Sequence, residues 1–200
     1  HVSLNGLFSS PAVETLGLKK VHLVIHDVGG PVGLELAARL PDRIASLTIL
    51  NTLIVKVDRF RKPWSMTSFG VKGLGELSLK LLHPALFLQL MRLQGVRDHT
   101  KFNYGDAKAY LKLLKGNDNG RAFLKIMRSF EPSKAKGKLY QETMNSLQVP
   151  KQIIWGANDP ALSLKQYGRP TAQQYNIDRF YTVQGKHFLP EDNAPFIAEK

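Results

Sequence analysis

The fold is decided by residues 21–30, which read Val-His-Leu-Val-Ile-His-Asp-Val-Gly-Gly. The first half of this stretch is an apolar and β-branched run, a pattern that predicts a strand buried on both faces. The second half predicts a sharp turn at Asp27. In this turn, Gly29 and Gly30 allow the following helix, expected over residues 32–40, to approach the strand closely.

Further strands are predicted on both sides of the chain's midpoint. Residues 44–50 form a second apolar run, and two strands bridged by a helix of this length predict a βαβ unit with parallel strands. Near the C-terminus, residues 152–155 and 179–183 predict two more strands, again separated by a helical pattern. The sequence therefore predicts an α/β fold with a parallel sheet.

The middle of the chain has a different pattern. Residues 53–145 carry apolar side chains at helical spacing, interrupted by Gly and Pro, and predict four or five short helices. The expected organisation is an α/β core formed by residues 1–52 and 146–200, with residues 53–145 inserted as a helical cap.

Composition excludes several classes of protein. The 200 residues are 43% hydrophobic and contain no cysteine, which excludes a disulfide scaffold, a thiol nucleophile and a Cys-ligated zinc site. The net charge is +12, and residues 53–145 hold 18 basic against 7 acidic residues. Because these bases alternate with apolar residues, they predict solvated helix faces. Nucleic-acid binding by this segment is the weaker alternative, since no known nucleic-acid-binding module is visible.

The sequence predicts no targeting segment and no bound ion. It has no apolar run of about 18–20 residues, the length that spans a bilayer, so no membrane association is expected. Residues 1–10 lack the pattern of a signal peptide, and we expect a cytoplasmic protein, although the chain opens with His1 rather than Met. The six histidines show no metal-ligand spacing with carboxylates, so neither a metal nor another cofactor is predicted.

Three polar residues follow predicted strands and form the candidate catalytic set: Asp27, Asp159 and His187. Taken singly, they could be a helix cap, a turn residue and a surface histidine. The carboxyl ends of parallel strands meet at one edge of a sheet, however, where ligands bind. The order acid, acid, histidine at three strand ends therefore favours a catalytic site.

A strand, a sharp turn and a helix around one reactive side chain form a nucleophile elbow. The elbow residue here is Asp27, whose carboxylate can attack a saturated carbon without a general base and form an enzyme-bound ester. His187 would then deprotonate the water that hydrolyses the ester, with Asp159 orienting the imidazole. The backbone N–H of Val28 would donate to the developing oxyanion.

Three segments carry a resemblance to a known family: residues 25–30, residues 154–160 and residues 185–192. They resemble the α/β-hydrolase superfamily, and the aspartate elbow resembles the branch of haloalkane dehalogenases and epoxide hydrolases. The resemblance implies an α/β-hydrolase fold with a partial parallel sheet, in which the N-terminal strands are missing, and an inserted helical cap. The leading hypothesis is a small, largely apolar substrate, and a haloalkane, an epoxide or a related electrophile all stay open, because the motifs do not specify it.

The sequence departs from this family at two points. The branch usually has Trp after the nucleophile to hold the leaving halide, where this chain has Val28. No His-Gly-x-Pro segment, which supplies the second oxyanion donor in the family, precedes Asp27. Asn51 stands where some dehalogenases place the catalytic acid, and because an amide cannot serve as one, Asp159 is favoured.

The cap segment offers candidate groups for the substrate. A cap tryptophan could hold a halide and cap tyrosines could protonate an epoxide, although each of these side chains more commonly serves in packing. The candidates are Trp64, Tyr104, Tyr110 and Tyr140. A hypothesis from another class is that the chain is a non-catalytic fragment or binding module, since its second oxyanion donor is missing. The oligomeric state is left open.

Overall fold

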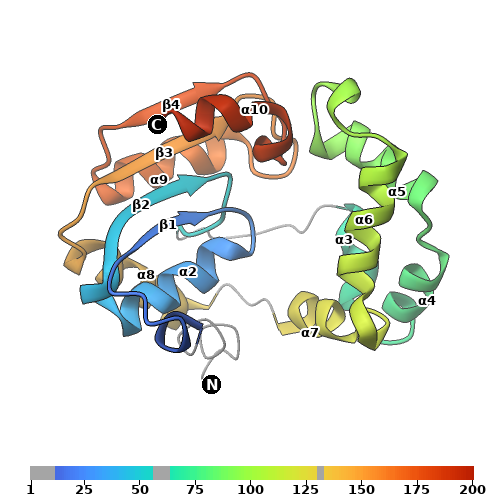
Figure 1. The fold of residues 1–200 in the computed structure, drawn as a ribbon, viewed down its shortest axis with the longest axis horizontal. Helices are drawn as coiled ribbons and strands as arrows, with labels where there is room; N and C mark the ends of the chain where they lie inside the picture. The colour runs from blue at the N-terminus through green and yellow to red at the C-terminus, as the bar shows by residue number, and fades with distance from the viewer. Residues whose placement is uncertain (1–11, 56–63, 130–132) are drawn as a thin grey trace. The chain divides into compact units, whose positions relative to one another are not determined.

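The structure, a computed structural model, describes residues 12–55, 64–129 and 133–200 (Figure 1). The chain divides into two compact units. The sheet unit comprises His1–Val57 and Ser133–Gln184, and the helical unit comprises Asp58–Pro132 and Gly185–Lys200.

Among its described residues, the sheet unit contains four parallel strands in the order β1-β2-β3-β4 (Figure 1). Pairing aligns Ile25 of β1 with Ile49 of β2 at the carboxyl end of the sheet. The expected strands and the parallel α/β architecture are thus confirmed. The bounds are β1 (Val21–Ile25), β2 (Ile44–Leu50), β3 (Lys151–Gly156) and β4 (Phe180–Val183).

Helices cover one face of this sheet. Helix α2 (Gly29–Arg39) packs on β1 so closely that a Cβ at Gly33 would lie 2.4 Å from Cγ2 of Ile25. Helix α8 (Lys134–Ser146) packs on α2, and Lys136 forms a 2.5 Å ion pair with the buried Glu35. The sheet unit also holds η1 (Pro41–Arg43), the π-helix η6 (Leu164–Gly168) and α9 (Arg169–Tyr175).

The prediction that β1 is buried on both faces is wrong. Leu23 and Ile25 point to the side of α2, whereas Val24 on the other face is 57% exposed. An alternating strand of this kind buries one face only, because its side chains point in turn to the two sides of the sheet. Whether that second face is covered depends on other segments and cannot be determined from the run itself.

The described residues of the helical unit form two apolar clusters. One is centred on Phe69, Leu79 and Leu124, and the other on Met91 and Phe102. The bounds are α3 (Trp64–Thr67), η2 (Ser68–Gly70), α4 (Leu74–Leu81), α5 (Pro84–Leu90), the π-helix η3 (Met91–Gly95), η4 (His99–Lys101), α6 (Tyr104–Lys115), η5 (Gly116–Asp118), α7 (Arg121–Ser129) and α10 (Leu189–Ala198).

Contacts divide the chain at different positions from the expected core and cap. Helix α8, expected in the cap segment 53–145, packs with the sheet unit, and residues 185–200, expected in the core, group with the helical unit. The assignment of 1–52 and 146–200 as a functional core stays a prediction.

Candidate active site

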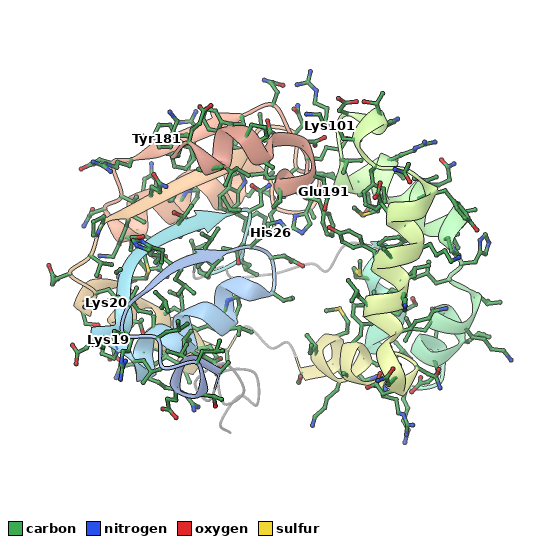
Figure 2. All side chains as sticks on the ribbon, viewed as in Figure 1. Lys19, Lys20, His26, Lys101, Tyr181 and Glu191 are labelled. Carbon is green, nitrogen blue, oxygen red and sulfur yellow. The ribbon has the colours of Figure 1, made fainter. Side chains whose placement is uncertain are left out.

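The turn after β1 has the geometry of an elbow. Strand β1 ends at Ile25, α2 begins at Gly29, and Asp27 between them has a φ of +47°. This left-handed conformation is uncommon for a residue with a side chain and costs of order 1 kcal/mol, so surrounding contacts must hold it. His26, labelled in Figure 2, lies at the carboxyl end of β1 directly before this turn. The expected sharp turn at Asp27 is therefore present.

The backbone of Asp27 is held at both ends by the loop after β2. Its N–H donates to the carbonyl of Asn51 at 3.0 Å, and its carbonyl accepts from Oγ1 of Thr52 at 2.5 Å. The same carbonyl accepts from the N–H of Gly30 at 3.0 Å, which continues the turn into α2. These bonds involve uncharged backbone groups, so they hold the turn whatever the charge on the Asp27 side chain.

Gly30 makes room for this arrangement, whereas Gly29 does not. A Cβ at Gly30 would lie 1.9 Å from Oγ1 of Thr52, an impossible contact. A Cβ at Gly29 would meet nothing within 4 Å. The expectation that both glycines let the helix approach the preceding strand is thus wrong for Gly29, and at Gly30 the close contact is with Thr52 after β2; the close contact with β1 is made at Gly33.

Asp159 is a buried carboxylate that follows β3. It is 4% exposed, and its Oδ1 accepts from the N–H groups of Ala161 and Leu162 at 2.7 and 2.8 Å. Its Oδ2 accepts from Nδ2 of Asn51 at 2.6 Å. Three N–H donors therefore replace water around this carboxylate, as a buried charge requires.

The two carboxylates belong to one edge of the sheet. Asp27 follows β1, Asn51 follows β2 and Asp159 follows β3, and these strands are neighbours in the sheet. Asn51 connects them, because its backbone carbonyl binds the N–H of Asp27 and its side chain binds Asp159. The structure thus brings two of the three predicted catalytic residues together.

His187 belongs to the helical unit and has its own supports there. The N–H of the next residue, Phe188, donates to the carbonyl of Gly95 at 2.9 Å. Nζ of Lys186 donates to the carbonyls of Arg92 and Leu93 at 2.7 and 3.0 Å. The histidine is thus flanked on both sides by bonds to the π-helix η3.

Val28 and Trp64 lie at helix starts. Val28 is the N-cap residue of α2, and its side chain makes no capping bond. The N–H groups of the first helical turn lack intrahelical partners, so this end of α2 favours negative charge. Trp64 begins α3, and its side chain lies outside the described residues.

Two of the tyrosines lie in the helical unit. Tyr104 opens α6 and is 54% exposed. Tyr110 lies on the same helix, packs against Phe102 and Phe188, and donates its hydroxyl proton to Glu191 of α10 (Glu191 is labelled in Figure 2). Burial, followed by the hydrogen bond to Glu191, raises the pKa of Tyr110 well above its ordinary value of 10.

The structure places Tyr140 in the sheet unit, not among the helices of the other unit. It lies on α8 and is 8% exposed. Burial, with a smaller effect of the nearby Glu35 charge, raises the pKa of the Tyr140 hydroxyl well above 10. Both Tyr110 and Tyr140 therefore keep their protons at neutral pH.

Two residues of this site are not indicated by the sequence motifs. The motifs do not single out Thr52, and they indicate Asn51 only as a position where an acid is absent. The available signal was their place directly after a buried strand, at the edge where Asp27 and Asp159 also lie.

Neither a metal cluster nor a spanning helix is found in the described parts of the chain. Within residues 12–55, 64–129 and 133–200, no three His, Asp or Glu side chains are grouped so as to hold a metal ion. The same residues contain no helix with the length and apolar character needed to cross a bilayer.

Comparison with known proteins agrees with the observed fold. A haloalkane dehalogenase of Mycolicibacterium paratuberculosis is 24% identical over 199 residues, covering 94% of this chain and 61% of the relative. The chain thus spans about three fifths of that relative's length. Cfl2 from Burkholderia cenocepacia superposes with a TM-score of 0.80 at 18% identity, covering 97% of this chain and 68% of that chain.

A second solved structure shows the same fold. The 2-hydroxy-6-oxo-6-phenylhexa-2,4-dienoate hydrolase of Rhodococcus superposes with a TM-score of 0.65 at 15% identity, covering 94% of this chain and 64% of that chain. The sequence pattern that describes the alpha/beta hydrolase fold matches residues 10–194, nearly the whole chain. The chain therefore belongs to the alpha/beta hydrolase fold family.

Proposed function

We propose that this protein is a hydrolase in which Asp27 is the nucleophile and a covalent alkyl ester is the intermediate. One observation carries the proposal: an aspartate occupies the left-handed position of a strand–turn–helix elbow. Family membership supports hydrolysis, and the aspartate at this position supports attack by a carboxylate. The haloalkane dehalogenase relative supports a small apolar electrophile as substrate.

In the first step, one oxygen of the Asp27 carboxylate attacks a saturated carbon. The carbon–halogen bond breaks as the carbon–oxygen bond forms, and the halide leaves with the bonding electron pair. Since the carboxylate is ionised at neutral pH, this step needs no general base.

In the second step, water hydrolyses the ester. His187 takes a proton from the water, whose oxygen attacks the carboxyl carbon of Asp27, and Asp159 stabilises the imidazolium that forms. The Val28 N–H at the start of α2 would stabilise the tetrahedral oxyanion. The alcohol leaves with the proton from His187, the Asp27 carboxylic acid that results loses its proton to solvent, and the carboxylate is regenerated.

An epoxide is the second candidate substrate. Val28 offers no side-chain donor for a halide, whereas an epoxide needs a proton donor for its oxygen, a role for which Tyr104 and Tyr110 of the helical unit are the candidates. The proposed attack by Asp27 is the same for both substrates. The leaving atom differs, because the epoxide oxygen stays attached to the product.

Two variants test the proposal in steady-state turnover of 1-bromobutane and styrene oxide. Asp27→Ala is expected to abolish turnover of the accepted probe, because no covalent ester can form. His187→Gln is expected to permit attack and block hydrolysis, so that product formation stops after one equivalent at most. Sustained turnover by either folded variant would overturn the residue roles, and a folded wild-type chain that accepts no probe would favour the binding-module alternative.

A further inference from the structure

The dipeptide Asn51-Thr52 lies between the two proposed catalytic carboxylates. It follows β2, the strand between β1 and β3, and both residues are fully buried. Two adjacent buried polar side chains are expected to be hydrogen-bonded, and what they bind indicates their role. One binds the backbone of Asp27 and the other binds the side chain of Asp159.

The Thr52 hydroxyl supports the elbow. Its Oγ1 donates to the carbonyl of Asp27 at 2.5 Å, directly after the residue's left-handed φ of +47°. Gly30 faces this hydroxyl without a side chain, and any Cβ there would displace it. The absence of a side chain at Gly30 thus leaves room for the Thr52 hydroxyl, whose hydrogen bond fixes the Asp27 peptide.

The orientation of the Asn51 side chain follows from its surroundings. The N–H of Gly156 is a donor and lies 2.9 Å from one end of the amide, which must therefore be the oxygen. The other end is then the NH₂ group, and it donates to Oδ2 of Asp159 at 2.6 Å. Asn51 thereby ties the end of β3 to the carboxylate that follows it.

We propose that Thr52 and Asn51 are positioning residues with separate duties in the two half-reactions. Thr52 holds the elbow so that the Asp27 carboxylate is aimed for ester formation. Asn51 holds Asp159 so that its carboxylate is aimed at His187 for ester hydrolysis. This inference rests on the proposed function, in which Asp27 acts in the first step and the His187–Asp159 pair acts in the second.

Single-turnover kinetics can separate these duties. The chain is mixed in excess with 1-bromobutane or styrene oxide, and quenched samples are analysed by mass spectrometry for the ester on Asp27 and for the released alcohol or diol. The rise of the ester gives the rate constant of its formation, and its decay gives the rate constant of hydrolysis.

Each variant removes the side-chain hydrogen bonds of one residue, one at Thr52 and two at Asn51. Thr52→Val preserves shape and removes the hydroxyl, and it is expected to slow ester formation about ten-fold, the effect of one hydrogen bond, with little change in hydrolysis. Asn51→Leu removes both hydrogen bonds of the side-chain amide, and it is expected to slow hydrolysis at least about ten-fold, so that the ester accumulates. Asn51→Ser is the second variant at this position, should the leucine variant not fold.

Two controls exclude a general loss of stability. Thr52→Ser keeps the hydroxyl and is expected to restore the rate of ester formation. Thr171→Val removes a buried hydroxyl that donates to the Tyr167 carbonyl at 2.7 Å elsewhere in the sheet unit, and is expected to leave both rate constants unchanged.

The outcomes are distinguishable. If Thr52→Val and Asn51→Leu each slow both steps equally, or leave both unchanged, the positioning roles are overturned while the proposed function stands. If the wild-type chain forms no ester and releases no product from either probe, the proposed function itself fails, and the separate positioning roles of Thr52 and Asn51 fail with it.

Discussion

The segment around His187 is held in place by different means from the loops that follow β1, β2 and β3. In the sheet unit, Asp27 and Asp159 are connected through residues 51–52, which follow the strand between theirs. The parallel strands alone bring these loops to a common edge. In the helical unit, His187 is flanked by bonds to the backbone of η3, a helix far away in the sequence.

The segment after His187 is fixed by a buried carboxylate. Asp192 of α10 is 7% exposed and accepts from the N–H groups of Arg97 and Asp98 at 2.8 and 3.0 Å. Nζ of Lys101, labelled in Figure 2, donates to the Asp192 carbonyl at 2.8 Å. Neighbouring strands of one sheet, with Asn51 and Thr52 between them, thus position the first pair of residues. The histidine segment is positioned instead by hydrogen bonds to segments distant in the sequence.

The largest expected effect concerns the elbow. Gly30→Ala forces a Cβ to within 1.9 Å of Thr52 Oγ1, and we expect it to lower the free energy of unfolding by about 3 kcal/mol, the upper range for overpacking. Gly29→Ala is the matched control, because its Cβ meets nothing within 4 Å, and its stability should equal or slightly exceed that of the wild type. Urea unfolding followed by circular dichroism measures both, and equal values for the two variants would contradict the tight elbow.

A smaller, local effect is expected in the helical unit. Asp192→Ala leaves the N–H groups of Arg97 and Asp98 without their acceptor, at a cost of about 2 kcal/mol. Hydrogen exchange should accelerate over residues 97–101 and 185–198 and stay unchanged over β1 to β3. Glu199→Ala, at an exposed position on the same segment, is the control. Uniform acceleration over both units would show that the two regions are not supported independently.

The smallest expected effect is on the pH dependence of stability, and it comes from a surface ion pair. The hydrogen bond from Arg128, together with backbone hydrogen bonds from Glu76 itself and from Gly73 and the charge of Arg128, lowers the pKa of Glu76 from its ordinary value of 4.5 to about 2. A carboxyl whose pKa is lower in the folded state contributes stability above its unfolded pKa. The contribution of Glu76 is therefore complete above pH 4.5 and is lost as the pH falls through about 2.

An NMR titration of the Glu76 carboxyl should show this low midpoint, and Arg128→Gln should return it toward 4.5. By contrast, the hydrogen bond from the Thr52 hydroxyl to the Asp27 carbonyl joins two uncharged groups, so it involves no group that titrates. A midpoint near 4.5 in the unmodified chain would show that the ion pair does not form in solution.

The sequence predicted the parts of the molecule that depend on local pattern. Apolar runs located the four strands, and turn chemistry located the elbow at Asp27. The exposure of Val24 was not predictable, because it depends on what covers the second face of the sheet. The hydrogen bond from the Phe188 N–H to the Gly95 carbonyl was not predictable either, because it joins backbone atoms of segments far apart in the chain.

The central claim is that Asp27 forms a covalent ester, and the most direct test is the intact mass of His187→Gln after incubation with 1-bromobutane or styrene oxide. We predict a single adduct that maps to Asp27, has the mass of the butyl group or of the hydroxyalkyl group from the opened epoxide, and is absent when Asp27→Asn is combined with His187→Gln. A folded His187→Gln protein that stays unmodified, or carries its adduct on another residue, would contradict the account.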